Sequence, residues 1–255
     1  MDVAIVGYGA VGKEIEKEML KKGIDDIYTI DKDITKNANF KSVSEFTRLV
    51  GPTSAIGADV YIICVWSQEQ VLDVVKETKL RNKPLISIET TCVPGTYQKV
   101  KEIVKERANV VVFPERWNPN DMNHGIFNQP RVMGGDYEAG RKFYLRYMLW
   151  ENIIIADKPE LAELCKIVEN AYRYVTIAIA EELKMLIGEN YDELRRLCNS
   201  KWNIELKEAR DGIDGACLPK DFKLFNEIFP KNTLLFKFAH IVNEEYVRRK
   251  KEPIE

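Results

Sequence analysis

Short apolar runs alternate with helix-length segments along the first part of the chain. Strands are predicted at 3–6, 27–30, 60–65, 85–88, 110–113 and 153–155. Apolar residues at helical spacing predict helices over 11–21 and 97–107. Strands separated by helices pair in parallel, and continuous apolar strands are typical of a sheet that is covered on both faces. We therefore expect an α/β fold with a Rossmann-like, doubly wound parallel sheet.

The pattern changes after the last predicted strand. Asp157 and Glu160 are spaced as in a capping box, and a helical pattern runs from there to about residue 187. Further helices are predicted over 192–200 and 232–249. We expect a Rossmann domain over 1–157, followed over 158–255 by an all-helical dimerisation domain with one long helix. Apolar positions along that helix exceed what one domain edge can cover, which predicts a homodimer.

A glycine-rich hexapeptide follows the first predicted strand and fits the pattern G-x-G-x-x-G: Gly7, Tyr8, Gly9, Ala10, Val11 and Gly12. In this pattern Gly7 permits a tight turn, Gly9 lets the backbone approach a pyrophosphate, and Gly12 lets helix and strand pack closely. Asp31 ends the second predicted strand, where a carboxylate accepts hydrogen bonds from ribose hydroxyls. The sequence therefore predicts an NAD site, while Lys32 leaves tolerance of a 2′-phosphate open.

Charge and cysteine content narrow the class of partner. The chain has 38 Lys plus Arg against 40 Asp plus Glu, a net charge of −2, which argues against a nucleic-acid partner. No stretch approaches the roughly 20 apolar residues of a membrane helix, and the start does not resemble a secretory signal. The five cysteines are widely spaced, which argues against a zinc site and favours reduced thiols. We expect a cytoplasmic protein without a metal or membrane partner.

Two further groups of residues are candidates for chemistry. Loops after the later strands carry Val65, Ser67, Thr91, Glu115 and Arg116, at the edge where open α/β sheets bind ligands. Residues of these types also form ordinary turns without a ligand. For Ser67 the turn-forming and the ligand-binding interpretation are equally supported. Glycines predict a loop at 215–221 (GACLPKD), in which Lys220 and Asp221 follow Cys217. A cation favours a thiolate, and a carboxylate handles protons. A lone cysteine is more often a small buried apolar residue, so this segment alone leaves catalysis open.

Segments along nearly the whole chain match a known family in its order: GYGAVG at 7–12, FPERWNP at 113–119, RVMGG at 131–135, AELCKIVENAYRYVTIAIAEEL at 162–183, GACLPKD at 215–221 and LFKFAHIVNEEY at 235–246. They resemble the UDP-glucose/GDP-mannose dehydrogenases, which are NAD-dependent nucleotide-sugar 6-dehydrogenases. The resemblance implies oxidation of a sugar C6 alcohol to a carboxylate with two NAD per turnover. The intermediates would be a thiohemiacetal and a thioester on a cysteine.

The resemblance also implies residue roles. Cys217 would be the nucleophile, and Lys166 and Asn170, four residues apart on one helix face, would stabilise the alkoxide. Asp221 would hold a water together with Thr91 for deprotonation of the alcohol, and Glu115 would be the general base of thioester hydrolysis. Arg116 would meet a substrate phosphate or hydroxyl, or form a surface ion pair. The substrate site would thus hold Glu115, Arg116, Lys166 and Asn170, and the NAD site would add Val65, Ser67, Thr91 and Lys220.

The chain departs from the family at three places. Trp66 lies in a loop where the family often has V-P-T-P, and Asp214 stands where a glycine is usual. Family members are longer, and their C-terminal domain supplies much of the nucleotide pocket. The resemblance therefore predicts a chain without the UDP-binding domain. Such a chain is a natural short form, a truncated relative, or half of a split enzyme whose C-terminal domain is a separate subunit.

Two other functions stay open. A β-hydroxyacid-type NAD dehydrogenase shares the Rossmann domain, the long helix and the Lys166–Asn170 spacing, but needs no cysteine. A non-catalytic NAD-binding partner protein is the other alternative.

Overall fold

A computed structural model of the chain describes residues 1–24, 26–31, 57–78, 80–121, 123–215, 217–231 and 233–251. The chain divides into two compact units, Met1–Lys166 and Ile167–Glu255. The division falls inside one long helix, α6, which spans Pro159–Ile187. Of the helices in the described residues, none is both long and apolar enough to span a membrane.

A sheet with strand order β2-β1-β3-β4-β5-β6-β7 forms the centre of the first unit. Its strands are β1 (Val3–Val6), β2 (Ile27–Ile30), β3 (Val60–Ile63), β4 (Leu85–Ile88), β5 (Asn109–Val112), β6 (Arg131–Gly135) and β7 (Ile153–Ile155). The first five strands pair in parallel as expected. The sequence pattern did not predict β6, which runs antiparallel to β5 and pairs Val112 with Gly134. β7 then pairs in parallel with β6.

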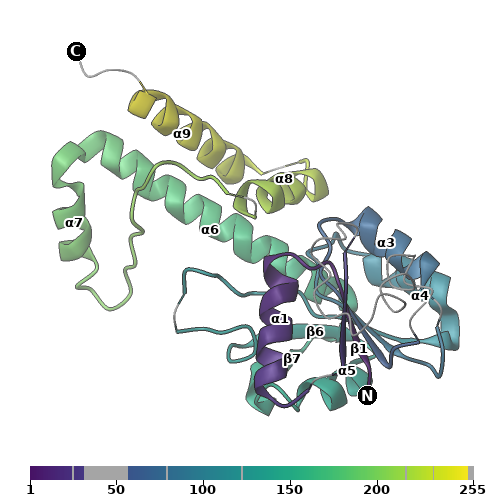
Figure 1. The fold of residues 1–255 in the computed structure, drawn as a ribbon. Helices are drawn as coiled ribbons and strands as arrows, with labels where there is room; N and C mark the ends of the chain where they lie inside the picture. Colours follow the sequence, from purple (N-terminus) through teal and green to yellow (C-terminus); the bar gives the residue numbers. More distant parts are fainter. Residues whose placement is uncertain are drawn as a thin grey trace. The chain divides into compact units, whose positions relative to one another are not determined.

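Helices cover both faces of this sheet. They are α1 (Ala10–Lys21), α3 (Gln68–Glu77), α4 (Thr96–Val104) and α5 (Tyr137–Tyr144). The helices α1 and α5 pack on one face, and α3 and α4 pack on the other (Figure 1). Successive residues of β1 serve opposite faces: Val3 and Ile5 join the α1 side, and Ala4 and Val6 the α3 side. The expected doubly wound α/β fold is confirmed.

Several predicted boundaries shift by a few residues. The predicted strand at 60–65 ends at Ile63, so Val65 lies in the loop that follows β3. The predicted helix at 97–107 ends at Val104 and continues as a short 3-10 turn over Lys105–Arg107. These shifts place the loop candidates at the edge of the sheet.

In the described part of the second unit, helices are the only regular elements after β7. They are α6, α7 (Tyr191–Cys198), α8 (Leu218–Ile228) and α9 (Leu234–Lys251). The segment 215–221 was expected to be a loop, and that was wrong in part, because Leu218 begins α8. Pro219 explains the difference, since proline is well tolerated in the first turn of a helix.

The helices α6 and α9 lie side by side (Figure 1). Aromatic side chains of α8 pack against both of them. Tyr174 of α6 stacks on Phe222 of α8, with ring centroids 3.9 Å apart and an interplanar angle of 15°. Phe225 of α8 packs on Phe236 of α9 with centroids 4.3 Å apart. The first turn of α8 therefore has a fixed position next to α6.

Candidate active site

The carboxyl ends of β1, β3, β4 and β5 meet at one edge of the sheet. Backbone hydrogen bonds join the residues just beyond them: Gly7 N–H donates to Ile30 O at 2.8 Å, and Cys64 N–H donates to Val6 O at 2.7 Å. The strand order reverses between β1 and β3, because β1 continues to β2 on one side while β3 lies on the other. Open α/β sheets bind ligands at such a switch point.

Two glycines of the hexapeptide are required by the fold itself. Gly7 has φ +95°, and a Cβ there would lie 2.6 Å from Cys64 O. A Cβ on Gly12 would lie 2.3 Å from Gly7 O and 3.2 Å from Ile5 Cγ2. The first turn of α1 can approach β1 only because both residues lack a side chain.

Gly9 has a different role. It is the N-cap of α1, and a Cβ built there would meet no atom within 4 Å. Ala10 and Val11 begin the helix and leave its N-terminus accessible. An open approach to backbone N–H groups at a helix N-terminus is what a pyrophosphate needs.

Asp31 is held at the end of β2. Its Oδ2 accepts the Tyr8 N–H at 2.8 Å. The Tyr8 side chain is buried and its hydroxyl donates a hydrogen bond to Glu16, which fixes the position of the glycine-rich turn. The predicted contact of Lys32 lies outside the described residues.

In the loop after β3, Ser67 and Val65 form defined hydrogen bonds. Ser67 is the N-cap of α3, and its hydroxyl accepts the Gln70 N–H at 3.4 Å. The Val65 carbonyl accepts the Thr90 hydroxyl at 3.0 Å. Thr91 follows β4 and is half-buried. For Ser67 the structure thus gives a helix-capping role beside the predicted cofactor contact.

A buried ion cluster lies next to these loops. The Arg131 guanidinium is fully buried, and its Nη1 lies 2.9 Å from Glu115 Oε2 in an ion pair without hydrogen-bond alignment. Its Nη2 donates to Glu89 and to the Phe113 carbonyl. The guanidinium also stacks over the Phe113 ring at 3.9 Å.

Glu115 is the member of this cluster that was predicted to be a general base. Its Oε1 accepts the backbone N–H groups of Arg116 at 2.7 Å and Trp117 at 2.6 Å. Burial raises the pKa of Glu115 to about 7; Arg131 and Lys166 oppose this shift, and Glu89 adds to it. Two predicted site residues, Glu115 and Lys166, are thus electrostatically coupled. A carboxylate with a pKa near neutrality is suited to act as a general base.

The side chain of Arg116 forms hydrogen bonds within the first unit. Its Nη1 donates to Pro130 O at 2.7 Å, and its Nη2 donates to Cys165 Sγ at 3.4 Å. These contacts tie the loop after β5 to the start of α6. A contact with substrate stays a prediction.

In the second unit, Asn170 and Asp221 form a buried pair. Asn170 Nδ2 donates to Asp221 Oδ2 at 2.6 Å, and Lys220 Nζ lies 3.6 Å from Asp221 Oδ1. The Asp221 N–H donates to Cys217 O at 2.9 Å, so Cys217 lies one helical turn before Asp221. Cys217 is exposed and is the N-cap residue of α8.

The sequence model of the UDP-glucose/GDP-mannose dehydrogenase family, central domain, matches residues 160–245, which include Lys166, Asn170, Cys217 and Asp221. Residues 160–245 of the chain are therefore similar to the central domain of this family. A UDP-N-acetyl-D-mannosamine dehydrogenase of Pyrococcus horikoshii is 27% identical over 269 residues, which cover 93% of this chain and 63% of the relative. The chain spans 60–63% of the length of the first curated relatives.

Two solved structures match the fold. The structure of UDP-D-ManNAc dehydrogenase from Pyrococcus horikoshii has a TM-score of 0.80 at 24% identity, covering 96% of this chain and 69% of that one. A 3-hydroxyisobutyrate dehydrogenase of Mycobacterium tuberculosis has a TM-score of 0.67 at 17% identity, covering 98% of this chain and 94% of that one. The fold is therefore shared by this family and by a dehydrogenase of another class.

Sequence reasoning missed four buried polar residues around the family motifs. Arg131 and Glu89 belong to the ion cluster, and Tyr144 of α5 donates to Glu89. Glu163 of α6 accepts the N–H groups of Gly95 at 2.6 Å and Tyr97 at 2.7 Å, so it caps α4. Single charged residues at the ends of apolar strands, such as Glu89 after Leu85–Ile88, were the available signal.

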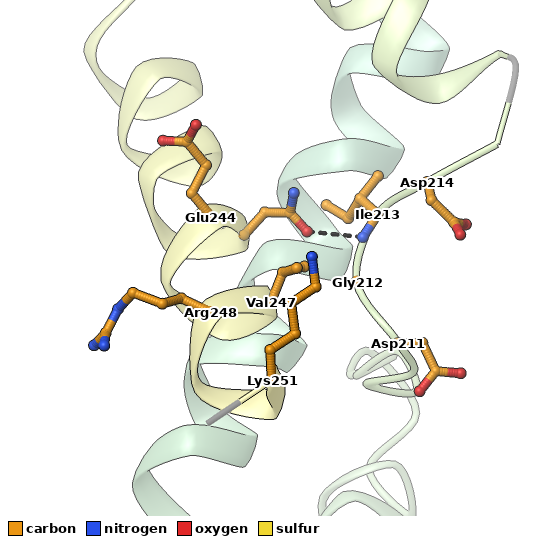
Figure 2. Close-up of a pocket in the computed structure, with 9 residues that line it drawn as sticks. Asp211, Gly212, Ile213, Asp214, Glu244, Val247, Arg248 and Lys251 are labelled. Carbon is orange, nitrogen blue, oxygen red and sulfur yellow. Dashed lines mark hydrogen bonds between the residues drawn. The ribbon is translucent and has the colours of Figure 1, made fainter. Parts of the chain in front are cut away.

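A groove of about 670 Å³ lies in the second unit, between the segment before Cys217 and α9 (Figure 2). Asn243 Oδ1 accepts the Ile213 N–H there at 2.7 Å. Charges of both signs line it, including Asp211, Glu244 and Arg248, and none of the predicted site residues does. We attribute no chemistry to it, because it is open and its charges are paired or exposed.

Proposed function

We propose that the chain takes part in NAD-dependent oxidation of a nucleotide sugar at C6, through a covalent intermediate on Cys217. The observation that carries this proposal is the buried Asn170–Asp221 pair with Cys217 one helical turn before Asp221. The names of the relatives make UDP-N-acetyl-D-mannosamine the first substrate to test. Within the UDP-glucose/GDP-mannose dehydrogenases, UDP-glucose is the natural alternative.

The residues of the first unit fit the dinucleotide. The open face of Gly9 and the N-terminus of α1 would hold the pyrophosphate, and Asp31 would accept hydrogen bonds from a ribose. When bound, NAD supplies the acceptor for the hydride that leaves C6. Asp31 favours NAD because a 2′-phosphate would meet a carboxylate.

Cys217 explains why a second oxidation is possible. Its thiolate attacks the aldehyde carbon, a C–S bond forms, and the protonated oxygen gives a thiohemiacetal. This adduct loses a hydride from carbon to the acceptor and a proton from its hydroxyl, which leaves a thioester. Water then attacks the thioester carbonyl, the C–S bond breaks, and the carboxylate and the Cys217 thiol are released.

The remaining residues handle charge and protons. Lys166 and Asn170 would stabilise the oxygen that becomes negative in each addition, and Asp221 holds the Asn170 amide in place through the hydrogen bond described above. Glu115 would deprotonate the hydrolytic water. Its pKa of about 7 matches this role near neutral pH.

Turnover with purified protein tests the proposal. NADH formation is followed by absorbance with UDP-N-acetyl-D-mannosamine, UDP-glucose and 3-hydroxyisobutyrate. We expect oxidation of a UDP-sugar that Cys217→Ala abolishes, while Cys198→Ala, a free cysteine on α7, leaves it unchanged. If none of the UDP-sugars reduces NAD, the proposal is wrong.

A β-hydroxyacid dehydrogenase is the second candidate. It is favoured by the match to a 3-hydroxyisobutyrate dehydrogenase, of which the chain covers 94%. That chemistry is a single oxidation and needs no thiol. Oxidation of 3-hydroxyisobutyrate that survives Cys217→Ala would favour this candidate.

We also propose a homodimer. α8 and α9 cover one side of α6, where Ile167, Ala171 and Val175 are buried. Another line of apolar side chains along α6 is exposed: Val168, Tyr172, Ile179 and Leu186, of which Leu186 is 76% exposed. A two-fold pairing of these helices would bury them.

A further inference from the structure

The ion cluster of the first unit draws on four separate elements. Glu89 follows β4, Glu115 follows β5, Arg131 begins β6, and Tyr144 lies on α5. All four side chains are buried. One cation and two carboxylates in such a place are costly unless each is held by a partner.

The partners are arranged in a chain. The Tyr144 hydroxyl lies 2.8 Å from Ser87 Oγ and donates to Glu89. Burial and the Glu89 carboxylate raise the pKa of Tyr144, so its hydroxyl stays a donor. Glu89 accepts from Arg131 Nη2, which leaves Nη1 directed at Glu115 Oε2. The guanidinium is therefore fixed from one side and faces Glu115 with the other.

We propose that Arg131 is the positioning residue for the Glu115 carboxylate, with Glu89 and Tyr144 as the anchors of its guanidinium. Glu115 is then held at both oxygens, Oε2 by Arg131 and Oε1 by the two backbone N–H groups. The inference rests on the proposed function only in the role of Glu115 as a base. It assigns to Arg131, Glu89 and Tyr144 the task of setting where that base lies and when it is charged.

The charges around Glu115 give the inference a signature. The groups that face it are Arg131 from β6, Glu89 after β4, Lys166 from α6 and Cys64 after β3. Arg131 and Lys166 lower the pKa of Glu115, and Glu89 raises it. Glu89→Gln should therefore lower the pKa of Glu115, and Arg131→Met should raise it. Loss of packing alone would not move the pKa in opposite directions.

Carbon-13 NMR of the full chain, labelled at glutamate Cδ, measures this pKa without substrate, and Glu115→Gln assigns the signal. We expect a fall of about 1 pH unit or more in Glu89→Gln and a rise of about 1–3 in Arg131→Met. Arg131→Lys keeps the charge but contacts fewer acceptors, so it should give a smaller rise. Arg146→Met and Glu106→Gln remove exposed charges and serve as controls.

If Arg131→Met does not fold, Glu89→Gln and Arg131→Lys still carry the test. A Glu115 pKa in Glu89→Gln that stays at the control value, or rises, would overturn the inference. If the pKa moves as expected but no UDP-sugar is oxidised, the proposed function fails and the positioning role stands. With turnover, the acid limb of kcat should move with the measured pKa while KM for the sugar stays unchanged.

Discussion

Alanine substitutions at the three glycines of the hexapeptide should have different consequences. Gly7→Ala places a side chain at φ +95° with its Cβ 2.6 Å from Cys64 O. The left-handed backbone costs about 1–2 kcal/mol, and relief of the contact costs about 1–3 kcal/mol more. Gly12→Ala keeps ordinary dihedrals but forces a Cβ to 2.3 Å from Gly7 O. Both changes should destabilise the first unit.

Gly9→Ala should leave the fold intact and impair the cofactor. Gly9 has φ −80°, and a Cβ there meets no atom of the chain within 4 Å. Alanine is a poorer N-cap than glycine but restricts the unfolded chain, so the two effects, each below about 1 kcal/mol, oppose each other. The new methyl group would occupy space that the pyrophosphate needs, so NAD affinity should fall about tenfold or more, which corresponds to about 1.4 kcal/mol.

Thermal denaturation and calorimetric titration with NAD separate these effects. At about 2–4 °C per kcal/mol for a chain of this size, Gly7→Ala should lower Tm by about 4–20 °C. Gly9→Ala should change Tm by less than about 4 °C. Wild-type NAD affinity in Gly9→Ala, or an unchanged Tm in Gly7→Ala, would refute the assignment of this turn.

Three further changes follow from the same structure. A carboxylate acts as a base only when it is ionised, and the pKa of Glu115 is about 7. If Glu115 is the proposed base, kcat should fall as the pH drops below 7, and Glu115→Gln should remove this limb from the pH–rate profile. Glu181 is fully buried, both its oxygens lack a hydrogen-bond partner, and burial raises its pKa from 4.5 to about 7. The pKa of Glu181 is higher in the folded than in the unfolded state, so the stability it contributes is present below pH 4.5 and is lost as the pH rises through 7. Urea unfolding at pH 8 should therefore find Glu181→Gln more stable than wild type by about 1–3 kcal/mol, with no such gain below pH 4.5. Tyr172→Glu places a charge in the exposed line on α6, and light scattering should report a monomer, whereas Lys237→Glu on α9, an exposed charged position, should stay dimeric.

Local pattern was sufficient for much of the fold. The apolar runs at Val3–Val6, Ile27–Ile30 and Leu85–Ile88 are strands with the predicted ends, and α6 ends at the predicted residue. β6 was missed because Arg131–Gly135 has one charged residue and two glycines, and its β-structure depends on pairing with β5 and β7. The start of α8 was missed because the glycines before Cys217 suggested a loop.

The site shows the same division. The turn at Gly7–Gly12 and the motif around Cys217 are contiguous in sequence, so spacing and resemblance were enough to single them out. The cluster around Glu115 joins Arg131 to Glu89 across 42 positions and Tyr144 to Glu89 across 55. No local pattern reports such contacts, and only the fold brings these side chains together.

The covalent intermediate offers the most direct test of the proposed chemistry. Glu115→Gln removes the base that would release the product, so the thioester should accumulate during incubation with NAD and the UDP-sugar that the wild-type protein oxidises. Peptide mass spectrometry of the quenched protein should find the acyl nucleotide-sugar on the peptide that contains Cys217. A quenched protein that has formed NADH but carries no adduct on Cys217, or carries it on another cysteine, would contradict the account.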